Sequence, residues 1–381
     1  MRIVFLGSSL AAGRDGVGDY IRSLSAELTR QGHHCLAIGL ADTEDALDEC
    51  NPIVRIDRHR PWAQRLLQAR VAIAGFAPDW VSLQFVPYAW HPRGYALGLG
   101  KRLAPLFGRR RRHLMFHELW VGLNRHDRFV NRMHGIVQRH VVRHLHYTLR
   151  PDLTHTQTPA YVSTLAADHI AAQRLPLFGN IPVAPGDRAA IRRELIAAHA
   201  PALDPSRTLV AGWFGTVHRE WNGVEAVARL AAAARAEDRP LLLLSLGRTG
   251  AGGAALARHL SAAAPAGASF VDLGETPPEH ASRTLAAFDL ALTPNPVALV
   301  PKSGTVAACL DHGVPVLVTR DDWQLRGEAA IPPLDEPLVV SAGPEHPIDL
   351  PALLALRRAP APRLPAIARQ FAADLAAVAG V

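Results

Sequence analysis

The feature that most constrains the fold of this 381-residue chain is a regular alternation of short apolar runs with amphipathic segments. Apolar runs of about four to eight residues between turn residues predict strands that are buried on both faces. The segments between them carry apolar residues at the spacing of a helix. Repeated strand–helix–strand units predict a parallel sheet with right-handed crossovers, so the sequence predicts an α/β fold.

The first series of these units begins at the N-terminus. Residues 2–6 predict a buried strand, residues 12–19 form a glycine-rich loop, and the next segment predicts a helix that ends at Gly32. The series continues with predicted helices at residues 61–75, 94–107 and 129–146 and predicted strands at residues 35–40, 80–85, 113–117 and 154–156. Turn-forming residues at 178–182 then interrupt the pattern.

A second series in the same order follows a polar, proline-punctuated and partly helical connection at residues 182–205. Its predicted strands are residues 208–215, 240–247, 269–274, 290–294 and 314–318, and its predicted helices are residues 221–236, 254–264, 279–287 and 304–312. A chain of this length suits two domains. We therefore predict two Rossmann-like domains that face each other across a cleft, at residues 1–183 and 184–350.

The C-terminal segment, residues 351–381, is proline-rich at first and then amphipathic. Ile367, Phe371, Leu375 and Val378 share one face of a predicted helix. An apolar face of this kind needs a surface to cover, so we expect the helix to cross back and pack on the N-terminal domain.

Composition favours a globular protein without a nucleic-acid partner. Apolar residues make up 49% of the chain, and the formal net charge is +7. Part of the positive excess lies in the run Arg109–Arg112, just after Lys101 and Arg102. Such a run suits either a solvated loop or a contact with the phosphates of lipids or substrates. The sequence has no zinc-finger spacing and no aromatic RNA-binding signature, so we predict no binding of nucleic acid.

Cysteine usage and hydropathy predict the compartment. Cys35, Cys50 and Cys309 form neither a disulfide framework nor a set with metal-ligand spacing. The first residues lack the features of a signal peptide, and no uncharged apolar run reaches the ~18 residues of a membrane span. We therefore expect a cytoplasmic protein, with peripheral contact at the inner face of an anionic membrane.

Four motifs in these two series carry a resemblance to a known family. They are Gly16-Val17-Gly18-Asp19-Tyr20, His117-Glu118, Phe214-Gly215-Thr216-Val217, and the stretch from Asp289–Pro294 to Gly313–Val316. In this order, and over nearly the whole chain, they resemble the retaining GT-B glycosyltransferases of the family-four clan (glycosyl transferases group 1).

The resemblance implies a function and its partners. It implies that residues 1–183 bind the acceptor and that residues 184–350 bind a nucleotide-sugar donor. The implied reaction moves a sugar, such as a hexose, to an acceptor hydroxyl with retention of configuration, in bacterial glycan, polysaccharide or glycolipid synthesis. The acceptor would be a glycan or a lipid-linked molecule. The nucleotide-sugar is a co-substrate, and the resemblance implies no permanently bound cofactor and no metal.

The residues Lys302-Ser303-Gly304-Thr305 are the predicted site of the donor diphosphate. They lie at a strand-to-helix junction, where open α/β sheets bind ligands. A helix start offers N–H groups and a positive dipole end to the leaving diphosphate, and Lys302 adds a charge. The alternative is an ordinary helix cap with Lys302 in solvent.

The resemblance also implies roles for other residues. His117 would position the sugar, Glu118 would contact the acceptor or orient His117, and Arg219 would assist Lys302 at the leaving group. No general base is needed, because the leaving phosphate is thought to take the acceptor proton in these enzymes. The remaining implied donor-binding residues are Gly16, Gly18, Gly215, Thr216 and His218.

The sequence departs from the family pattern at the donor motif. Thr216 and Asn222 stand where the family has an arginine and a lysine, and Val300 and Ala308 stand where it has two glutamates. These departures keep open a catalytically inactive, GT-B-shaped binding or scaffold subunit. Another Rossmann enzyme, such as a sugar-nucleotide epimerase or a dehydrogenase, is disfavoured because no Gly-x-Gly-x-x-Gly directly follows the first strand.

Overall fold

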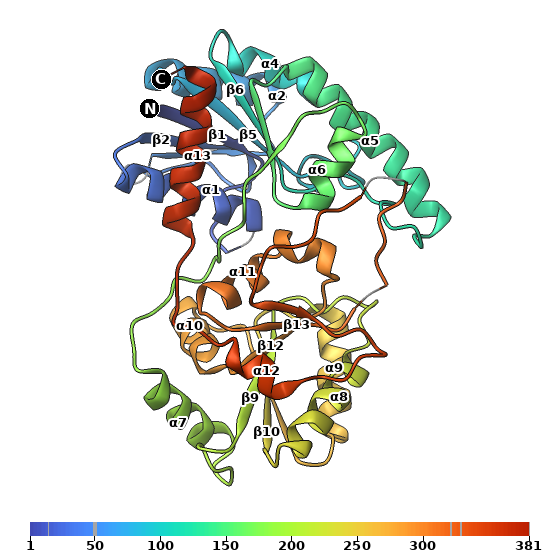
Figure 1. Cartoon of the computed structure of the whole chain (residues 1–381). Coiled ribbons are helices and arrows are strands. Elements are labelled where there is room, and N and C mark those ends of the chain that lie inside the picture. The colour runs from blue at the N-terminus through green and yellow to red at the C-terminus, as the bar shows by residue number, and fades with distance from the viewer. Residues whose placement is uncertain (14, 49–51, 321, 328–329, 381) are drawn as a thin grey trace. The chain divides into compact units, whose positions relative to one another are not determined.

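The computed structural model describes residues 1–13, 15–48, 52–320, 322–327 and 330–380, which form two compact units (Figure 1). Cys50 lies outside the described residues. Unit 1 comprises Met1–Leu177, Gln324–Pro332 and Leu364–Val381. Unit 2 comprises Phe178–Trp323 and Pro333–Arg363.

Unit 1 contains an eight-stranded sheet in the order β3-β4-β2-β1-β5-β6-β7-β8. Neighbouring strands are parallel except at the edge, where β3 runs antiparallel to β4. The strands are β1 (Arg2–Gly7), β2 (His34–Asp42), β3 (Ala46–Asp48), β4 (Ile53–Asp57), β5 (Trp80–Phe85), β6 (Arg111–Phe116), β7 (Leu153–Thr156) and β8 (Gln173–Arg174).

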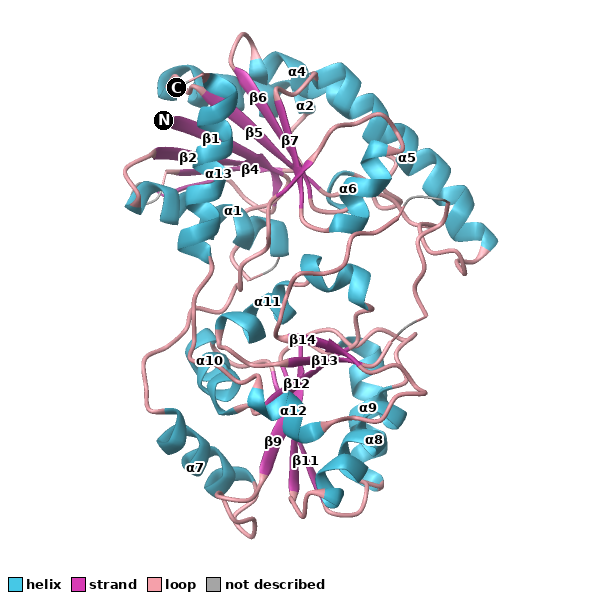
Figure 2. Cartoon of the chain, in the orientation of Figure 1, coloured by secondary structure: helices cyan, strands magenta, loops and turns pink. Residues whose placement is uncertain are grey.

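Two rows of helices pack on this sheet (Figure 2). Helices α1 and α13 contact each other, and α4 contacts both α2 and α5. The helices of unit 1 are α1 (Gly16–Arg30), α2 (Trp62–Phe76), α3 (Pro87–Trp90), α4 (Leu99–Phe107), α5 (Phe129–Leu149), α6 (Pro159–Ala166) and α13 (Leu364–Ala379).

The C-terminal helix α13 is part of the core of unit 1. The ring of Phe371 stacks on Phe5 of β1, with ring centroids 5.8 Å apart, and also contacts the rings of His113 and His155. Ile367 and Leu375 are buried as predicted, whereas Val378 is exposed near the end of the helix. The helix therefore packs on β1, β6 and β7.

Unit 2 contains a six-stranded, fully parallel sheet in the order β11-β10-β9-β12-β13-β14. The strands are β9 (Leu209–Phe214), β10 (Leu241–Leu246), β11 (Ala268–Gly274), β12 (Leu290–Thr293), β13 (Val316–Val318) and β14 (Val339–Ser341). The helices are α7 (Arg188–His199), α8 (Gly223–Ala236), α9 (Gly250–Ala262), α10 (Pro278–Ala287), the 3-10 helix η1 (Val297–Lys302), α11 (Gly304–Asp311) and α12 (Leu350–Ala355).

The predicted α/β fold with two parallel-sheet domains is confirmed, with differences at the edges. The helix predicted at residues 94–107 begins only at Leu99, because Gly94 and Gly98 adopt positive φ of 70° and 73°. The connection at residues 182–205 contains helix α7, which Asp187 caps by accepting hydrogen bonds from Ala189 and Ala190. Cys35 and Cys309 are buried free thiols, and desolvation raises the pKa of each to about 12.

We predict that Phe371→Ala lowers the unfolding free energy of unit 1 by about 3–5 kcal/mol, because it leaves a cavity between α13 and the sheet. Val378→Ala, on an exposed position of the same helix, should change the free energy by less than ~0.5 kcal/mol. Denaturant unfolding followed by circular dichroism measures both effects. Equal stability of the two variants would contradict the role of α13 in the core.

Candidate functional site

The predicted site residues lie at the carboxyl ends of strands in both units, where ligands bind in open α/β sheets. His117 and Glu118 follow β6 in unit 1, and Gly16 and Gly18 open helix α1 of the same unit. The residues predicted to bind the donor phosphates belong to unit 2. The two sets therefore belong to different units.

His117 is buried in unit 1, with only 5% of its surface exposed. Its backbone N–H donates to the carbonyl of Phe85, so it continues the pairing of β6 with β5. The edge of its ring packs against Tyr20 of α1 at a centroid distance of 4.7 Å. The structure thus brings His117 together with the helix that follows the glycine-rich loop.

Both ring nitrogens of His117 have partners inside unit 1. Nε2 lies 2.8 Å from Oε1 of Gln84, and Nε2 of Gln157 donates to Nδ1 at 3.0 Å. Burial lowers the pKa of His117 to about 3, so the imidazole is neutral at physiological pH. A ligand hydroxyl can therefore reach this imidazole only by replacing a glutamine amide.

The partners of His117 continue as a hydrogen-bonded series through the sheet. Gln84 Nε2 donates to Ser82 Oγ at 2.7 Å, and Ser82 Oγ lies 2.7 Å from His113 Nδ1. His113 Nε2 lies 3.0 Å from His155 Nδ1, and His155 Nε2 lies 3.2 Å from Asp374 Oδ2 on α13. We call the groups from Gln157 to Asp374 the His117 relay.

The three other predicted residues of unit 1 have different surroundings. A side chain at Gly16 would meet no atom within 4 Å, which leaves open space at the start of α1. A Cβ at Gly18 would lie 2.6 Å from the carbonyl oxygen of Ser9, so this glycine lets α1 pack on the loop after β1. Glu118 is partly exposed, one residue beyond His117.

In unit 2, the start of helix α11 has the geometry of an anion site. Ser303 is the N-cap, and its Oγ accepts from the N–H of Val306 at 3.4 Å. The first N–H groups of a helix have no partner within the helix. A Cβ at Gly304 would meet nothing closer than Oδ1 of Asn180 at 4.0 Å, so the space above the helix start is open.

The end of strand β9 lies directly against this helix start. A Cβ at Gly215 would approach Cγ2 of Thr305 to 2.5 Å, and Gly215 has a positive φ of 83°. Both facts require a glycine at this position. Thr216 is exposed beside it, with its hydroxyl donating to the carbonyl of Arg248 at 3.4 Å.

Positive groups gather near the same strand ends. Desolvation lowers the pKa of His218, and the charges of Arg320 and Lys302 lower it further, whereas Glu220 and a hydrogen bond with Asn295 oppose them. The side chain of Asn295 also donates to Ser303 Oγ at 3.3 Å. The predicted residues His218, Lys302 and Ser303 therefore belong to one neighbourhood.

Arg320 is a candidate residue that the sequence pattern did not reveal. It follows β13, donates to the carbonyl of Pro294 at 3.1 Å, and pairs with both carboxylate oxygens of Asp322 at 2.8 Å. The sequence feature that could have indicated Arg320 is its position shortly after β13, the strand that neighbours β12. Arg219 is exposed in the loop between β9 and α8.

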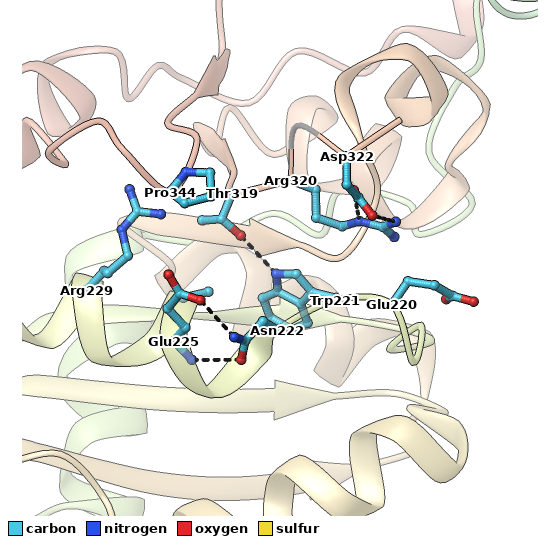
Figure 3. Close-up of a pocket in the computed structure, with 10 residues that line it drawn as sticks. Glu220, Trp221, Asn222, Glu225, Arg229, Thr319, Arg320, Asp322 and Pro344 are labelled. Carbon is cyan, nitrogen blue, oxygen red and sulfur yellow. Dashed lines mark hydrogen bonds and ion pairs between the residues drawn. The ribbon is translucent and has the colours of Figure 1, made fainter. Parts of the chain in front are cut away.

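Arg320 also lines a cavity of about 160 Å³ at the start of α8 (Figure 3). Within it, Trp221 Nε1 donates to Thr319 Oγ1 at 2.9 Å, and Asn222 caps α8 through the N–H of Glu225. Asn222 therefore has a structural role where the family has a lysine. The cavity is lined by Glu220, Trp221, Asn222, Glu225, Ala226, Arg229, Thr319, Arg320, Asp322 and Pro344.

The departures at the two glutamate positions of the family are buried. Val300 and Ala308, which stand where the family has glutamates, are 3% and 0% exposed in the core of unit 2. Their side chains cannot contact a nucleotide from these positions. Among the described residues, no group of three or more His, Cys, Asp or Glu side chains could hold a metal ion.

Comparison with protein-family models and with curated proteins finds no match. Solved structures do match. Anabaena Alr3699/HepE in complex with UDP-glucose superposes with a TM-score of 0.57 at 15% identity, over 99% of this chain and 100% of that one. A glycosyltransferase from Rickettsia africae matches with a TM-score of 0.51 at 11% identity, over 93% of this chain and 86% of that one.

An enzyme of another class has the same architecture. The UDP-GlcNAc 2-epimerase of Methanocaldococcus jannaschii matches with a TM-score of 0.51 at 11% identity, over 99% of each chain. At these identities the matches define the fold, which is the GT-B fold. Because transferases and epimerases share this fold, the fold alone does not define the reaction.

We predict that Gly304→Val weakens the binding of a nucleoside diphosphate at least tenfold, because the side chain would occupy the open space above α11. Stability should be little changed, since the space is empty of protein atoms. Calorimetry with UDP measures the affinity. Gly75→Val, at another glycine with open surroundings, is the control. Wild-type affinity in Gly304→Val would show that the diphosphate binds elsewhere.

Proposed function

We propose that the protein transfers a sugar, such as a hexose, from a nucleotide-sugar donor to an acceptor hydroxyl with retention of configuration. The observation that carries the proposal is the open start of α11, with Gly304 uncovered and Lys302 one residue before the N-cap. The proposed setting is bacterial glycan, polysaccharide or glycolipid synthesis, with a glycan or lipid-linked acceptor and no metal.

The charge that develops in such a reaction suits this site. The leaving diphosphate gains negative charge as the sugar becomes oxocarbenium-like, and helix N–H groups and fixed cations stabilise it. Lys302 is one of only two lysines in a chain with 41 Lys and Arg residues. A compact ammonium is a common phosphate ligand. Arg219 and His218 would assist from the loop after β9.

In unit 1, the proposal assigns the sugar and the acceptor to the surroundings of His117 and Glu118. A neutral imidazole is suited to a sugar hydroxyl and not to a phosphate, because it carries no charge. Gly16 leaves open space at the start of α1, where the glycine-rich loop could approach a ligand. The leaving phosphate would take the acceptor proton, so neither His117 nor Glu118 needs to act as a base.

Two other functions remain as outcomes of one experiment. One is an epimerase acting on a nucleotide-sugar, because the Methanocaldococcus enzyme has the same fold, and the other is a scaffold, because the donor motif departs from the family pattern. Incubation with a panel of UDP-, GDP- and ADP-sugars, with and without acceptor glycans, separates them. A transferase releases nucleoside diphosphate faster with its acceptor, an epimerase converts the sugar without release, and a scaffold does neither.

We predict that Lys302→Ala lowers kcat by roughly 10²–10³-fold while the protein stays folded, because it removes a donor to the leaving diphosphate. Initial-rate measurements with saturating donor and acceptor test this. Lys101→Ala is the matched control, since Lys101 is the other lysine and lies on α4 in unit 1. An unchanged rate in Lys302→Ala would sink the assignment.

We also propose that unit 1 contacts an anionic membrane through helix α5. None of the described helices is long and apolar enough to span a bilayer. The run Arg109–Arg112 contributes less to such a membrane contact than its charge suggests, because two of its arginines bind backbone carbonyls. Arg111 donates to the carbonyl of Ala379 at 2.9 Å and Arg112 to that of Leu149 at 2.7 Å, so both cap helix ends.

Helix α5 has an exposed stripe at helical spacing. Its first half is apolar, with Phe129 71%, Met133 49% and Ile136 61% exposed. Its second half carries His140, Arg143 and Tyr147 at the same spacing, and Nη1 of Arg143 lies 3.8 Å from Oδ1 of Asp168. The segment 129–149 contains no acidic residue. Apolar insertion combined with basic contacts is the pattern of a helix that lies on an anionic bilayer.

A second copy of the chain fits this stripe less well than a bilayer does. In an antiparallel pair the apolar half of one helix would face the basic half of the other, and in a parallel pair the basic halves would repel each other. An anionic lipid surface satisfies both halves at once.

We predict that the protein sediments with vesicles of phosphatidylcholine and phosphatidylglycerol but not with phosphatidylcholine alone, and that high salt reduces binding. The double variant Phe129→Asp/Ile136→Asp should lose most of this binding. Val378→Asp, at an exposed apolar site on α13, should keep it. Wild-type binding by the double variant would exclude α5 as the contact.

A further inference from the structure

The His117 relay is buried and fully connected in unit 1. Ser82 and His155 are 0% exposed, His113 is 1% and Gln84 is 2% exposed. Each of these four groups has one neighbour on either side within 2.7–3.2 Å. His155 Nε2 and Asp374 Oδ2 are both buried and lie 3.2 Å apart, and among the described residues neither atom makes a hydrogen bond of regular geometry.

The chemistry of the last group fixes the direction of every hydrogen bond. An ionised carboxylate can only accept, so the contact of 3.2 Å with Asp374 favours a proton on Nε2 of His155. In a neutral ring, Nδ1 of His155 then accepts from Nε2–H of His113. By the same step, Nδ1 of His113 accepts from the hydroxyl of Ser82.

The same direction continues to His117. The Ser82 hydroxyl accepts from the Gln84 amide, and Oε1 of Gln84 accepts from Nε2–H of His117. Nδ1 of His117 is then an acceptor, and Nε2 of Gln157 donates to it. In this order, every hydrogen bond of the relay is donated toward Asp374.

We propose that Asp374 is a positioning residue that sets the tautomer of His117 from the C-terminal helix. It holds the proton of His117 on Nε2 and keeps Nδ1 as an acceptor. One consequence rests on the proposed function: the group that replaces the Gln157 amide at Nδ1 must be a hydrogen-bond donor, such as a sugar hydroxyl. A phosphate oxygen, which only accepts, is excluded from this nitrogen.

The opposite direction of all these hydrogen bonds is the alternative outcome of the test. If His155 carried two protons, its Nδ1–H would donate to His113, and every later bond would reverse. The amides of Gln84 and Gln157 would turn over, and His117 would carry its proton on Nδ1. The position of one proton on His117 therefore reports the direction of the whole relay.

Nuclear magnetic resonance of protein with ring-¹⁵N-labelled histidine tests the inference without any substrate. Long-range ¹H–¹⁵N spectra distinguish the two tautomers, and His117→Gln, His113→Gln and His155→Gln assign the signals. In the wild type we expect the Nε2–H form for all three histidines. An Nδ1–H form of His117 in the wild type overturns the proposal, whether or not any variant folds.

Variants of Asp374 test whether this residue controls the tautomer of His117 through the relay. Asp374→Leu removes the acceptor, so a buried Nε2–H on His155 becomes costly and we expect His117 to shift to the Nδ1–H form. Asp374→Asn keeps an oxygen acceptor and should restore the wild-type form. Asp152→Asn, which removes a carboxylate outside the relay on the loop before β7, should change nothing.

A wild-type tautomer in folded Asp374→Leu would refute the role of Asp374. The result is independent of sugar transfer, so failure of this inference and failure of the proposed function can be told apart.

Discussion

The interaction on which the first unit depends is the burial of a carboxylate-terminated series of polar groups under helix α13. Buried polar groups destabilise a fold unless each finds a partner, and Ser82, His113 and His155 are each partnered by neighbours in this series. The last partner, Asp374, comes from a helix more than two hundred residues beyond these strands. The same helix contributes Phe371, whose ring packs on Phe5 and on two histidines of the series. Apolar packing by Phe371 and the contact of Asp374 with His155 thus both fix the position of α13 on the sheet.

The second unit meets a different constraint, because its candidate site must stay uncovered. Gly215 allows the end of β9 to approach Thr305 more closely than any side chain would permit. Gly304 then leaves the first turn of α11 open, and Lys302 and Arg320 contribute charge at neighbouring strand ends. The two glycines let the backbone of β9 and α11 approach closely, whereas Lys302 and Arg320 lie at the edge of the candidate site. This arrangement concentrates N–H groups and positive charge without burying either, which is what an anionic ligand requires.

The alternation of strands and helices could be predicted from the sequence because each signal is local. Strand β8, with two residues, and edge strands β3 and β14, with three each, lack such a signal because pairing with a neighbour defines them. Helix α6 was missed although Thr158 and Pro159 form a regular helix start. At the site, the positions of His117 and Ser303 followed from strand ends. The partners of His117 did not, since Gln84 lies on β5 and Gln157 follows β7, and only sheet order brings them near. Arg320, which follows β13, was missed for the same reason. The buried Val300 and Ala308 also show that a motif position cannot be given a ligand role until its burial is known.

The candidate sites of the two units differ in their chemistry, and each limits the kind of group that it can bind. Unit 2 supplies a helix dipole and cations, which favour a group that gains negative charge. Unit 1 supplies a neutral imidazole whose burial resists protonation, so it can bind a hydroxyl but can neither neutralise a phosphate nor readily accept a full charge. A reaction that needed a protonated histidine at this position would have to overcome that desolvation. Departure of a diphosphate needs no such proton, because the charge is stabilised where it forms. The chemistry of the side chains, rather than the shared fold, is thus the argument for glycosyl transfer.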